Sequence, residues 1–265
     1  MDIKQIFFSF LFFAIFLLSC KNNSSVENNQ SKENNVTPLS FETKSFHRKA
    51  GECKEDYVKC IQVKLKYPEA NQGIEKTRDT INKYINSMLL EAIVPDPDKK
   101  VKNIDDAAAL LVQYYEEQIA EFPDYEMAWE VDVDGTAQII EDYAVITLPV
   151  YSNMGGAHPN HFTAIANFNL ETGKELKLRD IVEDNKAFKA LAEKKFIEAR
   201  LTDYDLGEVN IDDFFFGEGF QLPENFGITK EGIYFYYNPY EAAPYALGST
   251  EFTISFKELE GIVQL

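Results

Sequence analysis

Residues 151–161 hold the densest group of small and polar side chains in the sequence. Two of the chain's three histidines, His158 and His161, follow the adjacent glycines Gly155 and Gly156. Imidazole binds metals and moves protons near neutral pH, so these histidines, with Asp or Glu from a neighbouring strand, could form a metal-dependent or catalytic site. The alternative is a structural hairpin turn whose glycines allow a positive φ and whose imidazoles bond to backbone carbonyls. No HExxH helix accompanies the pair, which favours the hairpin.

A second group of candidate residues lies between Gly232 and Phe252 and is rich in tyrosine. Alternating Tyr234 and Tyr236 are typical of a strand that packs its rings into a core. Tyr240 and Tyr245 lie among Pro and Gly, where aromatic rings are more often exposed and bind sugars or proteins. The residues that we predict to form a binding surface are Tyr151, Gly155, Gly156, His158, Asn160, Tyr240 and Tyr245.

The charge balance excludes several partners. The chain of 265 residues carries 26 Lys+Arg against 44 Asp+Glu, a net charge of −18, which argues against nucleic acid and against adhesion to anionic lipid. The cation-free runs 103–173 and 201–229 contain 13 and seven acids, so the rest of the chain carries only +2. We expect an acidic surface that attracts a cationic partner, with a merely solvating surface as the alternative. The sequence has no P-loop, dinucleotide fingerprint or Gly-x-Ser-x-Gly elbow and predicts no cofactor.

The N-terminus predicts export and a lipid anchor. Lys4 precedes an apolar run, 6–18, that is too short to span a membrane but fits a secretory signal. The run ends in Leu17-Leu18-Ser19-Cys20, which resembles the bacterial lipobox. We therefore expect residues 1–19 to be a signal peptide and Cys20 to carry the lipid; the alternative is a simple secretory signal with a chance cysteine. The segment 20–40 is rich in Asn and Ser and is predicted to be a flexible tether.

The two remaining cysteines suit an oxidising compartment. Cys53 and Cys60 flank a polar stretch between two strand-like segments, so a disulfide across a hairpin is expected. Two cysteines without a histidine at ligand spacing cannot fill a zinc site, so we predict no metal.

Periodicity indicates an α+β fold. Apolar residues at helical spacing predict helices, and alternation predicts strands joined by Asp-Gly-type turns. The expected helices are 74–93, 104–122 and 185–201, and the expected strands are 40–49, 57–67, 125–134, 137–142, 143–151, 161–170, 226–229, 232–238 and 250–256. Helices separated from runs of strands predict an antiparallel β-sheet with helices packed on one face.

Three segments resemble a pair of bacterial extracytoplasmic domains. They are Gly155–Asn160, Asn169–Ile181 and Tyr240–Gly248. The pair occurs in RsiV-like lysozyme-binding anti-sigma factors and in the non-catalytic part of PdaC-like peptidoglycan deacetylases. The resemblance implies an N-terminal PdaC/RsiV-like domain over 41–165 and a C-terminal RsiV-like domain over 166–265, packed as one unit.

What the resemblance implies is a non-catalytic module outside the cytoplasm. The leading hypothesis is a lipid-anchored cell-envelope protein, not an enzyme, that binds a cationic cell-wall enzyme such as lysozyme or a peptidoglycan glycan. In a Gram-negative organism its membrane would be the outer membrane. One alternative is an envelope hydrolase, deacetylase-type or metal-dependent enzyme that uses His158 and His161, and another is a structural lipoprotein.

Overall fold

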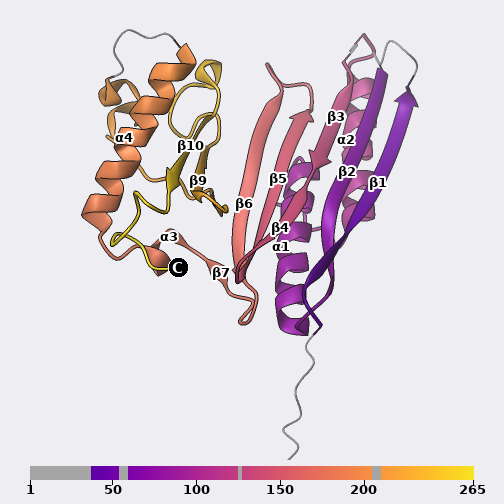
Figure 1. Ribbon diagram of the computed structural model, residues 1–265. Coiled ribbons are helices and arrows are strands. Elements are labelled where there is room, and N and C mark those ends of the chain that lie inside the picture. The colour runs from indigo at the N-terminus through magenta and orange to yellow at the C-terminus, as the bar shows by residue number, and fades with distance from the viewer. Residues whose placement is uncertain (1–36, 54–58, 125–126, 205–209) are drawn as a thin grey trace, which may run out of the picture. The chain divides into compact units, whose positions relative to one another are not determined.

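Two β-sheets and their helices make up the computed structural model, which describes residues 37–53, 59–124, 127–204 and 210–265 (Figure 1). The larger sheet has seven strands in the order β1-β2-β3-β5-β6-β7, with β4 also paired to β5, and the smaller has the order β10-β9-β8. The strands of the larger sheet are β1 (Ser40–Glu52), β2 (Lys59–Gln72), β3 (Trp129–Asp134), β4 (Thr136–Ile140), β5 (Tyr143–Asn153), β6 (Asn160–Asn169) and β7 (Glu175–Leu176). Those of the smaller sheet are β8 (Phe226–Ile228), β9 (Gly232–Tyr237) and β10 (Thr250–Ser255).

The α+β class is confirmed, but the larger sheet is mixed rather than wholly antiparallel. Strands β2 and β3 run parallel, with Ile61 opposite Trp129 and Lys66 opposite Asp134. The chain between them forms two helices, α1 (Glu75–Ile93) and α2 (Ile104–Glu121). A long helical crossover returns the chain to the same end of the sheet, so the next strand pairs in parallel.

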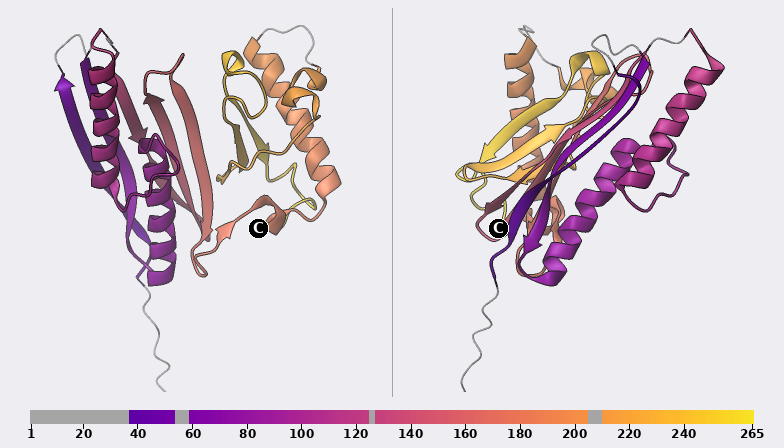
Figure 2. Two further views of the ribbon diagram at one scale, coloured as in Figure 1. Left: turned by 180° about the vertical axis from the view of Figure 1, so that it is seen from behind. Right: turned by 90° about the vertical axis from the view of Figure 1, so that its right-hand side faces the viewer.

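Helices α1 and α2 cover one face of the larger sheet, as predicted (Figure 2). Ile81, Ile85 and Leu89 of α1 are almost fully buried at the predicted helical spacing. Asn103 caps α2 by accepting the backbone N–H of Asp106 at 2.8 Å, and this satisfies a donor that the first turn leaves open. Among the described residues, no helix is long and apolar enough to cross a membrane.

The smaller sheet packs on the long helix α4 (Asn185–Tyr204). Phe188, Ala192 and Phe196 are fully buried in this second core, as their spacing predicts. The remaining helical elements are α3 (Leu178–Ile181) and the single turns η1 (Ile211–Asp213), η2 (Phe215–Gly217) and η3 (Tyr245–Leu247).

A third, smaller apolar cluster joins the two sheets. Val145 and Ile165 of the larger sheet pack with Ile228 of β8. Gly227 lies so close that an added Cβ would come within 3.3 Å of Ile165. The predicted boundary between 165 and 166 falls inside β6 and stays a prediction.

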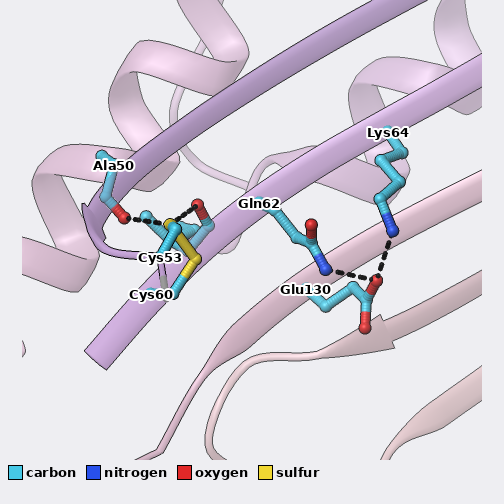
Figure 3. The surroundings of a disulfide bond; sticks show 7 residues. Ala50, Cys53, Cys60, Gln62, Lys64 and Glu130 are labelled. Carbon is cyan, nitrogen blue, oxygen red and sulfur yellow. Dashed lines mark hydrogen bonds and ion pairs between the residues drawn. A yellow bond between two sulfur atoms is a disulfide. The ribbon is translucent and has the colours of Figure 1, made fainter. Parts of the chain in front are cut away.

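The predicted disulfide between Cys53 and Cys60 is present (Figure 3). It joins the end of β1 to the start of β2, where Gly51 is paired with Cys60. A loop of this length contributes about 2–3 kcal/mol by restricting the unfolded chain. The predicted signal peptide, the lipid site at Cys20 and most of the tether lie outside the described residues.

An ion pair ties α4 to the turn after β10 and makes stability depend on pH. Lys195 lies 2.7 Å from Glu258, whose carboxylate also accepts the hydroxyl and the backbone N–H of Ser255. These contacts, Lys195 first, lower the pKa of Glu258 from 4.5 to about 2. A lowered pKa stabilises the fold fully above pH 4.5, and this contribution disappears as the pH falls towards 2.

We therefore expect Glu258→Gln to lower the urea midpoint at pH 7 and to change it little at pH 2. Glu260→Gln, two residues away, is the control: Glu260 is exposed like Glu258, but its carboxylate has no hydrogen bond or ion pair with the described residues, so the midpoint should be unchanged at both pH values. A Glu258→Gln deficit of the same size at pH 7 and pH 2 would contradict the assignment.

Candidate binding site

The β5–β6 hairpin positions the first candidate group. Tyr151 and His161 are directly opposite each other across its strands, with ring centroids 4.9 Å apart. Of the two glycines in the loop, only Gly155 has a positive φ, 80°. Gly156 has room for a Cβ, whose nearest neighbour would be 3.7 Å away, so this glycine is not required by the turn. Asn160 is exposed at the start of β6.

His158 lies in the loop of this hairpin and has a partner for each ring nitrogen. Nδ1 is 2.9 Å from the carbonyl oxygen of Pro159, and Nε2 is 3.1 Å from the hydroxyl of Tyr240. A carbonyl oxygen only accepts, so Nδ1 carries a proton. In the neutral imidazole, Nε2 then accepts the Tyr240 hydroxyl proton. The bond to a backbone carbonyl is the one that the hairpin interpretation predicts.

Tyr240 and Tyr245 come to His158 from the segment after β9. The ring of Tyr245 stacks on His158 with centroids 3.8 Å apart, and its hydroxyl donates to the carbonyl of Pro159 at 2.7 Å. Tyr240 is 53% exposed and has a φ of 72°, a region that bulky residues rarely adopt. We call His158, Tyr240 and Tyr245 the aromatic cluster. The sequence named all three, and the structure brings them together across more than 80 residues of chain.

Two asparagines that the sequence interpretation missed bond to β6: Asn238, at the start of this segment, and Asn225, just before β8. The side chain of Asn238 accepts the N–H of Thr163 at 2.6 Å and donates to its carbonyl at 3.2 Å. Asn225 accepts the N–H of Ile165 at 3.0 Å. These amides satisfy the backbone of β6 where β7 does not pair with it. The only signal in the sequence was Asn238-Pro239, which indicates a turn but not its partner.

A groove of about 450 Å³ lies on the face of the larger sheet that the helices do not cover. We call it the acidic groove; its lining includes Glu130, Asp132, Asp134, Tyr151, His161 and Tyr236. The three acids alternate with the buried Val131 and Val133 of β3, which places their carboxylates on the open face. Thr163 lines the groove as well, and its bond to Asn238 links the groove to the segment that carries the aromatic cluster.

Lysines of β2 partly neutralise this groove. Lys66 is 2.9 Å from Asp134, and Lys64 is 3.3 Å from Glu130 and 4.0 Å from Asp132. Gln62 also donates to Glu130 at 2.8 Å (Figure 3). Three carboxylates against two ammonium groups leave one net negative charge. Because β2 pairs in parallel with β3, these lysines lie beside acids of β3, which belongs to the cation-free run 103–173.

The other acids of the first cation-free run are spread over several elements. Asp105 and Asp106 begin α2, with Arg48 of β1 3.3 Å from Asp105. Glu141 and Asp142 form the turn between β4 and β5. In the second run, residues 205–209 lie outside the described part. A cation-free run of sequence is therefore not one acidic patch in space.

Two tyrosines of β9, Tyr234 and Tyr236, help to join the two sheets, and Tyr236 also lines the acidic groove. Tyr234 and Tyr236 are half-buried against the cluster that joins the sheets. Burial, and then a hydrogen bond to Glu251, raise the pKa of Tyr234 above its ordinary value. Its hydroxyl donates this hydrogen bond to the carboxylate of Glu251.

The metal-dependent alternative gains no support from the described residues. They contain no group of three or more His, Cys, Asp and Glu side chains placed to hold a metal ion. His158 bonds to Pro159 and Tyr240, while His161 packs on Tyr151.

Two protein families match the sequence, and the first match ends at the start of β6. Residues 51–161 match the family described as "Deacetylase PdaC", and residues 179–257 match "Protein of unknown function (DUF3298)". The chain carries this PdaC–DUF3298 domain pair. The aromatic cluster forms where the two matched regions meet, because His158 belongs to the first and both tyrosines to the second.

Solved structures give the domain pair the same fold. A DUF3298 family member from Bacteroides fragilis NCTC 9343 has a TM-score of 0.63 and 18% identity, covering 86% of this chain and 94% of that chain. A DUF3298 family protein from Pseudomonas aeruginosa PAO1 has a TM-score of 0.59 and 19% identity, covering 86% and 95%. No curated protein matches the chain. PdaC-like and DUF3298 domains are typical of extracytoplasmic, envelope-associated proteins.

Proposed function

We propose that this domain pair is a lipid-anchored, non-catalytic binding module of the bacterial cell envelope. Its partner is a cationic cell-wall enzyme, such as a lysozyme, and the contact is made by the acidic groove and the aromatic cluster. One observation carries the proposal. The three carboxylates of the acidic groove and the exposed Tyr240 all lie beside the β5–β6 hairpin.

Physical chemistry favours a cationic protein as the partner. The net charge of −18 attracts a cation over the Debye length, about 8 Å at physiological ionic strength, and speeds encounter. Glu130, Asp132 and Asp134 then offer acceptors for Arg and Lys side chains. Tyr240, exposed and held by His158, supplies apolar contact of the kind that anchors protein interfaces.

Titration calorimetry of residues 37–265 with a cationic lysozyme tests this proposal. We expect binding at about 20 mM salt and binding at least tenfold weaker at about 500 mM, because screening shortens the reach of the charges. A neutral protein of similar size is the control and should not bind. Absence of binding at low salt would contradict the proposal.

The exposed ring of Tyr240 favours a second candidate, a peptidoglycan glycan, because sugars stack on aromatic faces. The same calorimetric titration with soluble peptidoglycan fragments separates the two candidates. Glycan binding should be insensitive to salt and should be lost in Tyr240→Ala, whereas binding of the cationic enzyme should depend strongly on salt.

Anchoring through Cys20 is a separate part of the proposal with its own test. We expect the expressed protein to sediment with membranes and the Cys20→Ala variant to lose the lipid. Metabolic labelling with a palmitate analogue measures the lipid directly, and Cys53→Ala together with Cys60→Ala is the control that should keep the label. Equal labelling of the Cys20→Ala variant would contradict the assignment.

A further inference from the structure

Strand β4 has an open edge. It pairs only with β5, in the antiparallel register that sets Ile140 opposite Tyr143. In a hairpin with a two-residue turn, the two residues that flank the turn form a hydrogen-bonded pair. Ile140 flanks this turn, and hydrogen-bonded residues alternate along the strand, so Ile140, Gln138 and Thr136 bond to β5. The residues between them, Ala137 and Ile139, direct their N–H and C=O groups away from β5. No other described strand pairs with this edge.

Beside this edge lie two hollows. The larger, about 760 Å³, has an apolar floor that includes Ile140, Ile228 and Leu259. The smaller, about 410 Å³, includes Leu39, Ile74 and Leu170. Both hollows are lined by Ile139 and Asp142, so they share the end of β4. Ile139 is 45% exposed, and Phe256, which lines the larger hollow, is 38% exposed.

The charges around the two hollows are mostly negative. Glu141 and Glu260 line the larger hollow, Glu171 lines the smaller, and Asp142 lines both. Lys230 is the one cation among the residues that line them. All five side chains are exposed, so they are free to turn towards a bound chain.

We propose that the open edge of β4 binds an extended peptide segment of another protein, one with alternating apolar and basic residues. Main-chain hydrogen bonds to Ala137 and Ile139 add it to the sheet as a further strand. Successive side chains of a strand point to opposite faces, so apolar residues enter the larger hollow and basic residues face Asp142 and Glu171. This site is separate from the acidic groove, and its test does not depend on the proposed function.

Charge argues against a second copy of this chain as the occupant. Two β4 edges paired across a twofold axis would bring Glu141 and Asp142 of one copy towards Asp134 of the other. With a net charge of −18 on each copy, repulsion opposes such a contact. A basic peptide gains from the same charges.

The test uses a blocked heptapeptide of alternating lysine and valine, with lysine at both ends, titrated into residues 37–265, which lie within one compact unit of the chain. We expect binding, and binding at least tenfold weaker when glutamate replaces lysine. Two further peptides carry methyl groups on backbone nitrogens, one peptide at every valine and the other at every lysine. Each modification removes the N–H donors from one edge of the peptide strand. A strand pairs through one edge, so one version should lose binding and the other keep it.

Protein variants locate the contact. Ile139→Lys places a charge on the open edge and should weaken peptide binding at least tenfold. Phe122→Lys is the matched control, because Phe122 is also exposed but lies at the end of α2, and should bind as wild type does. Failure of the lysine–valine peptide to bind, equal binding of the glutamate peptide, or equal effects of both methylations would overturn the proposal. A dimer in sedimentation that Ile139→Lys dissociates would overturn it in favour of a second copy.

Discussion

Replacing Asn167 with alanine should lower the free energy of unfolding by about 2–4 kcal/mol. Asn167 is fully buried in β6 and joins the two sheets. Its Nδ2 donates to the carbonyl of Phe226 at 2.7 Å, and its Oδ1 accepts the N–H of Ile228 at 2.8 Å. Alanine would leave both backbone groups of β8 buried without a partner, and each such group costs about 1–3 kcal/mol.

Urea unfolding followed by circular dichroism measures this loss. Asn160→Ala on the same strand is the control, because Asn160 is exposed and its replacement should change the free energy of unfolding by less than about 0.5 kcal/mol. A loss below about 1 kcal/mol in Asn167→Ala would mean that water or neighbouring residues replace the two bonds.

The second large effect is expected at Phe196, at the centre of the C-terminal core. Its ring centroid lies 5.2 Å from Phe214, 5.0 Å from Phe215 and 5.3 Å from Tyr237. The guanidinium carbon of the buried Arg200 is 5.9 Å from the same ring. Phe196→Ala should therefore lower the free energy of unfolding by about 3–5 kcal/mol, because it opens a cavity and removes a ring from beside a buried cation.

Two further substitutions test whether the loss of stability comes from the cavity at Phe196 or from the loss of apolar area alone. Phe196→Leu retains most of the volume and should cost about 1–2 kcal/mol. Phe122→Ala, at a half-exposed ring, should change stability by less than about 0.5 kcal/mol. Equal losses for Phe196→Ala and Phe122→Ala, measured by the same urea unfolding, would show that this core is not packed as described.

Local patterns were enough to predict most elements. Ile81, Ile85 and Leu89 are buried at helical spacing in α1, and Ile61, Val63 and Leu65 are buried on one face of β2. Two cysteines at the ends of a short polar stretch of sequence also predicted their disulfide. In each case the signal depends on residues close in sequence, where periodicity reports burial directly.

Which distant strands pair with each other could not be predicted in the same way. Whether β3 pairs with β2 in parallel depends on the path of α1 and α2, and nothing in the residues of either strand fixes it. Lys64 and Lys66 neutralise the acids of β3 only because of that pairing. Counting charge along the chain therefore overstated the acidity of the groove.

The residues of the candidate site were predicted from two distant segments of the sequence and assigned to one binding surface. Composition suggested His158, Tyr240 and Tyr245, but their contact depends on the two halves of the chain meeting at β6. The amides that make this contact, Asn225 and Asn238, read locally as turn residues. Their role follows from the unpaired edge of β6, which only the assembled sheet reveals.

The most direct test of the proposed function compares two triple variants in the lysozyme titration. Glu130→Gln, Asp132→Asn and Asp134→Asn remove the carboxylates of the acidic groove. Glu116→Gln, Glu121→Gln and Asp124→Asn make the same change in net charge on and beside α2, where these acids are exposed. Each triple variant keeps side-chain size and raises the net charge equally. The two differ in location and in the ion pairs with Lys64 and Lys66, which only the groove variant loses.

We expect the groove variant to bind the cationic lysozyme at least tenfold more weakly than wild type at about 20 mM salt, because Lys64 and Lys66 remain there unpaired and repel it. The α2 variant should bind within about twofold of wild type, because its change acts only through the screened long-range field. Equal affinities of the two variants, or wild-type affinity in the groove variant, would contradict a binding site in the acidic groove.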